Sequence, residues 1–218
     1  MIFHNREDAG RQLAERLEVF AVPHLPVVLG IPRGGVSVAF QVTQKLHAPL
    51  DVFLARKLGV PGHEELAFGA MAVGGKPMLD QQVVHAAGIS AQQIERIAAA
   101  TAATLNQRAK LYRGERPPVD VAGETVILVD DGIATGASML AAIRALREQK
   151  PARLVVAVPV APASTCAWLR REVDELVCLY APDDFYAVGQ FYRDFSQVSD
   201  EEVASLLQRA AADRRYRP

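Results

Sequence analysis

The sequence has 218 residues, of which 50% are hydrophobic and 22% charged, so we expect one α/β domain with a sizeable core and a subsidiary piece. Its 24 basic and 25 acidic residues leave a net charge of −1, which excludes the basic character of a general nucleic-acid or anionic-membrane binder. Cys166 and Cys178 lack C-x-x-C or Cys/His metal spacing, so we predict that both are core thiols, one on a helix and one on a strand.

Targeting signals are not apparent in the sequence. The N-terminus, M-I-F-H-N-R-E-D-A-G, contains acids and no apolar segment of the kind that a signal peptide has. The longest apolar run, residues 154–163, is too short to span a bilayer and contains Pro159 and Pro162. A cytoplasmic location is therefore the default expectation.

The first predicted elements are a helix, a strand and a second helix. Residues 7–19 have apolar side chains at helical spacing, which predicts an amphipathic helix with solvated charges. Residues 26–31 predict a strand, and residues 37–46 predict a helix. Between them, Gly34 and Gly35 would let backbone amides approach an anion, and Arg33 would supply a charge suited to a diphosphate. The alternative is a glycine turn beside a surface arginine.

A third strand is predicted over residues 50–55 and is followed at once by Arg56-Lys57. Cations at the end of this strand would lie on the rim where parallel sheets bind ligands, and a surface salt-bridging pair is the alternative. The next residues, P-G-H-E-E over 61–65, are polar and contain glycine, which favours a flexible lid over a reacting centre. His63 could touch a leaving pyrophosphate, but a single loop histidine is more often incidental.

The next predicted elements are a hairpin and a long helix. Residues 66–73 and 77–79 predict two strands joined through Gly74-Gly75. Residues 90–112 predict an amphipathic helix that Ser90 caps. The basic residues at its end are interpreted as favourable placement at a helix C-terminus, with a subunit contact or a diphosphate clamp as the alternative. These residues are Arg108, Lys110, Arg113 and Arg116.

Two acidic residues follow the next predicted strand, residues 126–129. Asp130 and Asp131 fall at the carboxyl end of this strand, where ligands bind in parallel sheets. Paired carboxylates can accept hydrogen bonds from vicinal hydroxyls, so this position suits a ribose.

A turn of small and hydroxyl residues comes next, Ala134-Thr135-Gly136-Ala137-Ser138, before a helix predicted over residues 139–148. Consecutive backbone amides at a helix N-terminus, together with the hydroxyls of Thr135 and Ser138, suit a phosphate monoester. The lysine of the triphosphate motif G-x-x-x-x-G-K-[ST] is absent. The alternative is an ordinary strand-to-helix turn with Thr135 or Ser138 as a helix cap.

The C-terminal third contains two more predicted strands, residues 154–160 and 173–179, with a helix through Arg171 between them. An aromatic cluster follows, which could stack a planar base or form an apolar plug that anchors the tail. Its members are Phe185, Tyr186, Phe191, Tyr192 and Phe195. A helix over residues 201–212 completes the chain, and we expect its basic end, Arg214-Arg215, to fray.

Three of these motifs resemble, in the same order, the signature of the type I phosphoribosyltransferases: Arg33-Gly34-Gly35, Arg56-Lys57 and residues 130–138. The resemblance implies a Rossmann-like, twisted, mainly parallel sheet flanked by helices, with a small hood or lid. It implies a single domain over 1–218 that includes a lid or helical insertion at 59–120 and a C-terminal hood and tail at 181–218. The family's pyrophosphate loop often carries a cis peptide beside its basic residue, and the Ile31–Pro32 bond is another candidate.

The resemblance also implies a reaction, in which a nitrogenous base displaces pyrophosphate from phosphoribosyl pyrophosphate (PRPP). Mg²⁺ would be held mainly by PRPP, with Asp130 and Asp131 as its candidate protein ligands. Both carboxylates would face the cationic ribosyl transition state, while Arg33, Lys57 and Arg56 would face the leaving group. The catalytic candidates are therefore Asp130, Asp131, Arg33 and Lys57, the base candidates lie in the aromatic cluster, and a homodimer is a candidate assembly.

The acceptor base is the open part of this prediction. In the 6-oxopurine enzymes the residue before T-G carries a carboxylate, whereas here it is Ala134, so no general base is expected there. The A-T-G-x-S pattern resembles the uracil enzymes and favours a pyrimidine. Two alternatives remain: a non-catalytic PRPP- or nucleotide-binding regulator of the same fold, and a sugar-phosphate hydrolase or isomerase with Glu64 or Glu65 as its base.

Overall fold

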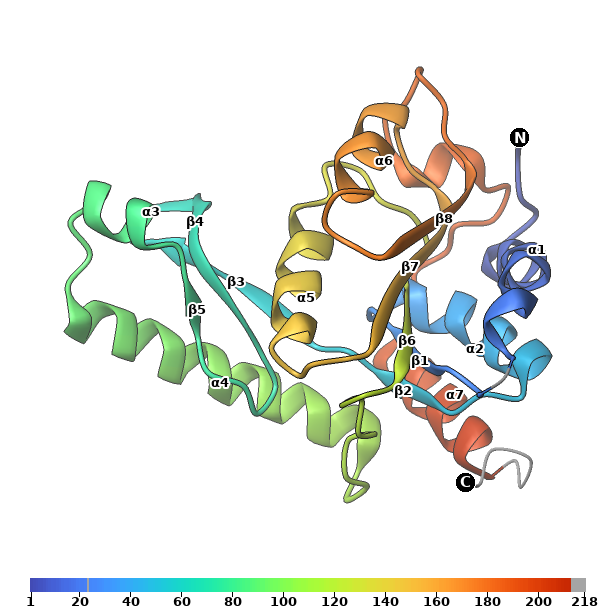
Figure 1. The fold of residues 1–218 in the computed structure, drawn as a ribbon, viewed down its shortest axis with the longest axis horizontal. Helices are drawn as coiled ribbons and strands as arrows, with labels where there is room; N and C mark the ends of the chain where they lie inside the picture. The colour runs from blue at the N-terminus through green and yellow to red at the C-terminus, as the bar shows by residue number, and fades with distance from the viewer. Residues whose placement is uncertain (23, 213–218) are drawn as a thin grey trace.

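A computed structural model describes residues 1–22 and 24–212, apart from the side chain of residue 65. The predicted basic end at Arg214-Arg215 lies outside the described residues, and so does the side chain of Glu65. Figure 1 shows a sheet with helices on both faces and an arm that extends away from it.

The central sheet has five parallel strands in the order β2-β1-β6-β7-β8. Leu29 of β1 lies beside Leu128 of β6, and Val129 of β6 lies beside Ala157 of β7. The central strands are almost continuously apolar, as expected for parallel strands that are buried on both faces. The strands are β1 Val27–Gly30, β2 Leu50–Val52, β6 Thr125–Val129, β7 Arg153–Val160 and β8 Glu175–Tyr180.

Helices cover both faces of this sheet. Because successive side chains of a strand point to opposite faces, Ile127 and Val129 belong to one core and Val126 and Leu128 to the other. The first core is shared with α1 (Arg6–Leu17), α2 (Gly34–Leu46) and α7 (Asp200–Ala212), and the second with α5 (Ala137–Arg147) and α6 (Ala163–Leu169). Short 3-10 helices span Glu18–Phe20 and Val188–Phe191. This arrangement confirms the predicted fold class.

The arm is built from a second, antiparallel sheet and two helices. Leu58 and Phe68 of its sheet are buried together with Leu105 of its long helix. Ser90 and Gln93 form the capping box at the start of that helix, which confirms Ser90 as its cap. The elements of the arm are β3 Ala55–Val60, β4 His63–Ala72, β5 Met78–Leu79, α3 Gln81–Ala86 and α4 Ala91–Arg113.

The segment after β2 differs from the prediction. Arg56-Lys57 do not follow the end of a parallel strand but lie within β3, because the chain leaves the central sheet after Val52 and pairs with β4. The residues predicted as a flexible lid form the end of this hairpin, where Gly62 has φ = +79°. Leu58 and Val60 are buried while Gly59 between them is not, and this alternation of every second residue is typical of a strand with one buried face.

One further helix boundary and one short helix were not predicted. Helix α2 begins at Gly34 rather than at residue 37, so the glycines form its first turn. Helix α3 was not expected, although its cap is a recognisable signal: the Asp80 carboxylate accepts hydrogen bonds from the backbone N–H groups of Gln82 and Val83.

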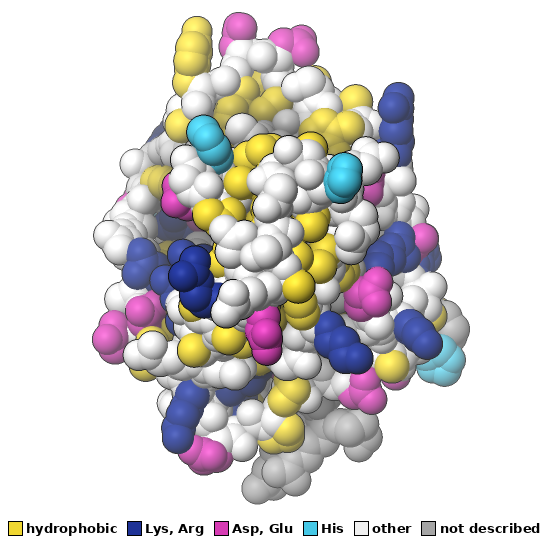
Figure 2. Space-filling model, turned by 90° about the vertical axis from the view of Figure 1, so that its left-hand side faces the viewer, with side chains coloured by type: hydrophobic (Ala, Val, Ile, Leu, Met, Phe, Trp, Pro, Cys, Tyr) yellow, Lys and Arg dark blue, Asp and Glu magenta, His cyan; other side chains and the backbone are white. Residues whose placement is uncertain are grey.

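On the face that the arm presents, hydrophobic side chains form a band between charged ones (Figure 2). An apolar groove of about 580 Å³ lies along α4 and is lined by residues such as Met71, Leu79, Ile94 and Ala98.

Elsewhere in the described chain, Cys166 is buried on α6 and the half-buried Cys178 lies on β8, which confirms both as free core thiols. Among the residues that the structure describes, no helix is long and apolar enough to cross a membrane.

Candidate active site

The loop after β1 packs directly against the acidic pair that follows β6. The Pro32–Arg33 peptide bond is cis, so the cis bond lies beside the basic residue and not at Ile31–Pro32. A Cβ atom on Gly35 would lie 2.8 Å from the carbonyl oxygen of Val129 and from the Cα atom of Asp130. A Cβ atom on Gly34 would overlap the Asp131 carboxylate. The close packing brings the predicted pyrophosphate loop and the predicted ribose carboxylates to one rim of the sheet.

The two carboxylates of the pair have different surroundings. Asp130 Oδ1 accepts a hydrogen bond of 2.8 Å from the backbone N–H of Asp131. Burial, reinforced by the neighbouring Asp131 charge, raises the pKa of Asp130 well above its ordinary value. Asp131 Oδ2 instead lies 2.7 Å from Nε of Arg6, and the two side chains are only 15% and 12% exposed. Asp131 therefore has a fixed cationic partner.

Arg6 is a site residue that was not predicted from the sequence. It begins α1 and lies 125 positions from Asp131, so no local pattern pairs the two residues. Its Nη1 atom also donates a 2.7 Å hydrogen bond to the carbonyl oxygen of Ser196, and its guanidinium lies 3.9 Å from the centre of the Phe195 ring. Arg6 lies one residue before the helix predicted over residues 7–19, and its charge is enclosed by these contacts.

The predicted phosphate loop joins β6 to α5. Gly136 has φ = +79° and occupies the N-cap position without any side-chain capping bond, so neither Thr135 nor Ser138 caps the helix. The first N–H groups of a helix have no intrahelical acceptor, and Ala134, Thr135, Ala137 and Ser138 are exposed. From the neighbouring α6, Thr165 Oγ1 donates a 2.8 Å hydrogen bond to the Ala134 carbonyl oxygen. The loop is therefore held in place with its amides available to an anion.

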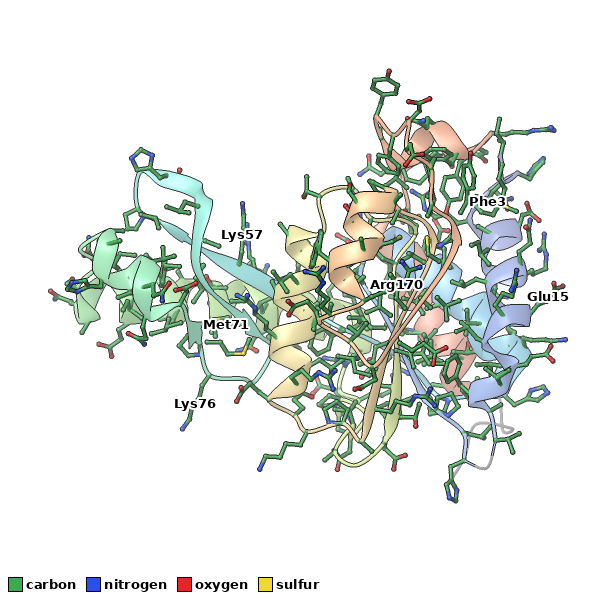
Figure 3. The ribbon with its side chains drawn as sticks, turned by 45° about the horizontal axis from the view of Figure 1, so that its top comes forward. Phe3, Glu15, Lys57, Met71, Lys76 and Arg170 are labelled. Atoms are coloured by element: carbon green, nitrogen blue, oxygen red, sulfur yellow. The ribbon has the colours of Figure 1, made fainter. Side chains whose placement is uncertain are left out.

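The predicted pyrophosphate-binding cations occupy two different places. Arg33 is partly exposed, with Nη1 4.0 Å from Asp200 Oδ1, an atom that also accepts a 2.6 Å hydrogen bond from the Tyr112 hydroxyl. Burial and this hydrogen bond raise the pKa of Tyr112 to about 12. Lys57 lies on β3 between the hairpin and α5 (Figure 3), where it lines a cavity of about 640 Å³ together with Ala137 and Arg144. Arg56 is exposed on the opposite side of the strand.

Two of the aromatic residues proposed for base stacking, Phe191 and Tyr192, are buried, and Phe185 is half-buried. Phe191 and Tyr192 pack with Phe3 in a small core, and Phe185 lies against Phe191 with ring centres 5.3 Å apart. The Phe3 N–H donates to the Phe191 carbonyl oxygen at 2.8 Å, so this cluster fastens the N-terminus to the tail. These three residues therefore fit the alternative of an anchoring plug. Tyr186, at 91% exposure, is far more open than Phe195, the other exposed member of the predicted set.

The basic end of α4 contains a buried ion pair rather than a set of solvated charges. Arg113 Nε lies 2.7 Å from Asp51 Oδ1 on β2, and its Nη2 donates to the Val52 carbonyl oxygen at 2.6 Å. The Asp51 carboxylate also accepts from the backbone N–H of Val119. Arg116 donates to the Leu207 carbonyl oxygen on α7. Arg113 does lie in the last turn of α4, as interpreted from the sequence, and its buried ion pair gives it a structural role in place of the diphosphate clamp.

Comparison with known proteins identifies the family. The model of the phosphoribosyl transferase domain matches residues 3–196. The chain belongs to this family. A protein of Mycobacterium tuberculosis that is provisionally named a phosphoribosyl transferase is 44% identical over 97% of this chain. A crystal structure of a protein from Thermus thermophilus is also 44% identical, with a TM-score of 0.87 over 96% of this chain and 99% of that chain.

The curated relatives are longer than this chain. The match covers 48% of the Mycobacterium protein, so the chain spans about half the length of the curated relatives it matches. The rim residues described above, from 33–35 to 134–138, all lie within the residues 3–196 that match the family model.

The close approach at Gly34 gives a first prediction. Gly34→Ala is expected to lower the free energy of unfolding by about 1–3 kcal/mol and to weaken PRPP binding, because the added Cβ would overlap the Asp131 carboxylate and lie 2.7 Å from Arg6 Nε. Thermal melting and calorimetric titration measure the two effects. Gly75→Ala is the matched control, since its nearest neighbour would be 3.5 Å away. Equal losses of stability and of PRPP affinity in the two variants would contradict the packing described at this loop.

Proposed function

We propose that the chain transfers the 5-phosphoribosyl group of PRPP to a nitrogenous base and releases pyrophosphate. The observation that carries the proposal is the packing of Gly34 and Gly35 against Asp130 and Asp131, beside the uncapped start of α5. One rim thus offers a candidate position for each part of PRPP: the 5-phosphate at 134–138, the ribose at the carboxylates and the diphosphate at Arg33.

In this reaction the bond between the anomeric carbon and the pyrophosphate oxygen breaks, and a bond to a base nitrogen forms. The pyrophosphate leaves with the electron pair of the broken bond, while the attacking nitrogen loses its proton to the solvent. Positive charge develops on the ribosyl ring, where Asp130 and Asp131 would stabilise it. Negative charge develops on the leaving group, where Arg33 and Lys57 would stabilise it. Holding both substrates on the rigid rim would supply the remaining acceleration.

A magnesium ion is compatible with these residues. The described chain contains no cluster of three or more His, Cys, Asp or Glu side chains that could form a complete metal site. Asp130 and Asp131 still offer carboxylate oxygens, and Mg²⁺ commonly binds through one or two carboxylates together with substrate phosphate oxygens. When bound, the ion would neutralise charge on the diphosphate.

The acceptor that we propose is a pyrimidine rather than a 6-oxopurine. Ala134 has no carboxylate with which to handle a purine proton, and its carbonyl oxygen already accepts a hydrogen bond from Thr165. Tyr186 is a highly exposed aromatic ring of the C-terminal segment and is our candidate to stack on a base.

The test is a pyrophosphate-release assay with PRPP and Mg²⁺ over a panel of pyrimidines and purines. The proposal predicts release with one pyrimidine and loss of that release in Arg33→Ala. Release with a purine alone would overturn the pyrimidine assignment but not the transferase. Tight PRPP binding without release by any base would favour the alternative of a regulatory protein that binds PRPP or a nucleotide.

A further inference from the structure

The Arg6–Asp131 pair is a largely enclosed contact of the acidic rim. Nε of Arg6 lies 2.7 Å from Asp131 Oδ2, and each side chain is less than one-sixth exposed. A residue at position 34 with any side chain would occupy the same space, since a Cβ there would lie 2.7 Å from Arg6 Nε. The guanidinium therefore fills the gap between the glycine loop and the carboxylate, on the side of α1.

Arg6 is itself held on its far side by the C-terminal segment. Its Nη1 donates to the Ser196 carbonyl oxygen at 2.7 Å, and Phe195 lies beneath the guanidinium plane at 3.9 Å. Phe195 stacks in turn on Tyr192, with ring centres 5.0 Å apart, and the Tyr192 hydroxyl donates to the carbonyl oxygen of Asp131. A closed circuit of contacts therefore joins the start of α1, the C-terminal segment and Asp131.

This circuit determines the orientation of the Asp131 carboxylate. Oδ2 is engaged by Arg6, and it occupies the space beside Gly34 that a Cβ atom would otherwise fill. The other oxygen, Oδ1, remains for an incoming hydroxyl group. A carboxylate held in one orientation by a charged partner binds hydroxyls with less loss of side-chain entropy than a freely rotating one.

We propose that Arg6 is a positioning residue that orients Asp131 for the ribose hydroxyls, and that the C-terminal segment at Phe195–Ser196 holds Arg6 for this purpose. The inference rests on the proposed function, in which Asp131 binds the ribose. It extends the sugar site from the acidic motif to the start of α1 and to the segment before α7. Arg6 does not touch the sugar; it acts through Asp131.

The experiment compares three ligands by calorimetric titration in the presence of Mg²⁺: PRPP, ribose 5-phosphate and pyrophosphate. Arg6→Gln is expected to weaken PRPP and ribose 5-phosphate about tenfold, the size expected when a charge-assisted hydrogen bond no longer holds the carboxylate. Pyrophosphate binding is expected to stay within about twofold, because that ligand lacks the ribose. Arg6→Lys keeps the charge and is expected to restore part of the loss.

Arg11→Gln is the matched control. Arg11 lies on the same helix but is 59% exposed, and its contacts with Glu7 and Asp8 are long, at 4.0 and 3.9 Å. It should bind all three ligands as the wild type does. Phe195→Leu serves as a second probe if Arg6→Gln does not fold, and is expected to weaken the two sugar ligands selectively.

Two results would overturn the inference: unchanged binding of the sugar ligands in the Arg6 variants, or an equal loss for all three ligands, which indicates a general defect of the fold. A wild-type chain that binds neither PRPP nor ribose 5-phosphate would overturn the proposed function itself, and the inference with it.

Discussion

Asp131→Asn is expected to lower kcat/KM for PRPP by about 10²- to 10³-fold while the protein remains folded. The substitution removes the negative charge that would stabilise the ribosyl cation, but it keeps a side-chain oxygen that can accept from Arg6 Nε, which now lies 2.7 Å away. The effect should therefore appear in turnover and PRPP affinity rather than in the melting temperature. Steady-state pyrophosphate release, with circular dichroism of the same samples, measures both.

The matched control for this substitution is Glu148→Gln. Glu148 is exposed at the C-terminal end of α5, the helix that follows the Asp131 loop, so the same loss of one negative charge occurs away from the rim. Activity of the control should equal that of the wild type. Unchanged turnover in Asp131→Asn would contradict the role of the carboxylate.

Asp51→Ala is expected to have the largest effect on stability, a loss of about 3–5 kcal/mol, because it leaves the Arg113 guanidinium buried without its partner. The two side chains are 7% and 9% exposed, and the Asp51 carboxylate also accepts the backbone N–H of Val119. For a domain of this size such a loss corresponds to a fall of about 10 °C in Tm or more. Thermal and denaturant unfolding measure it.

Glu175→Ala is the comparison for that experiment. It breaks the ion pair with Arg153, whose N···O distance is a short 2.6 Å but whose side chains are 42% and 48% exposed. Exposed pairs contribute about 0–1 kcal/mol, so Tm should change by no more than about 3 °C. Similar falls in Tm for Asp51→Ala and Glu175→Ala would show that burial does not determine how much these two ion pairs contribute to stability.

The fold was predictable from the sequence where the determinants are local. The near-continuous apolar runs of β6 and β7, the capping pair of Ser90 and Gln93, and the glycine-containing turns after β1 and β6 are all readable over a few residues. These features place Asp130 and Asp131 at the end of a central strand. They also place Gly34 and Gly136 at the starts of helices on the same rim.

The features that escaped prediction depend on contacts between distant residues. Arg6 and Asp131 are 125 positions apart, and Asp51 and Arg113 are 62 apart, so periodicity carries no information about either pair. Phe191 and Tyr192 were ambiguous for a related reason. Aromatic side chains suit both cores and binding sites, and only the packing of Phe3 decides between them.

The placement of Lys57 illustrates a topological error. The apolar pattern predicts one strand over residues 50–55 that ends in two cations, whereas the chain changes sheets after Val52 and starts β3 at Ala55. Lys57 thereby faces the start of α5 from the arm instead of from the central sheet. A cation on the arm can still reach an anion held at the rim, so the proposed role of Lys57 does not depend on the strand assignment.

The central claim is that the rim formed by Arg33–Gly35, Asp130–Asp131 and residues 134–138 binds PRPP. Calorimetric titration of the wild-type chain with PRPP, with and without Mg²⁺, and with ribose 5-phosphate tests it most directly. We predict saturable PRPP binding that strengthens with Mg²⁺ and exceeds that of ribose 5-phosphate, because the diphosphate adds its own contacts. Absence of PRPP binding under both conditions would contradict the account.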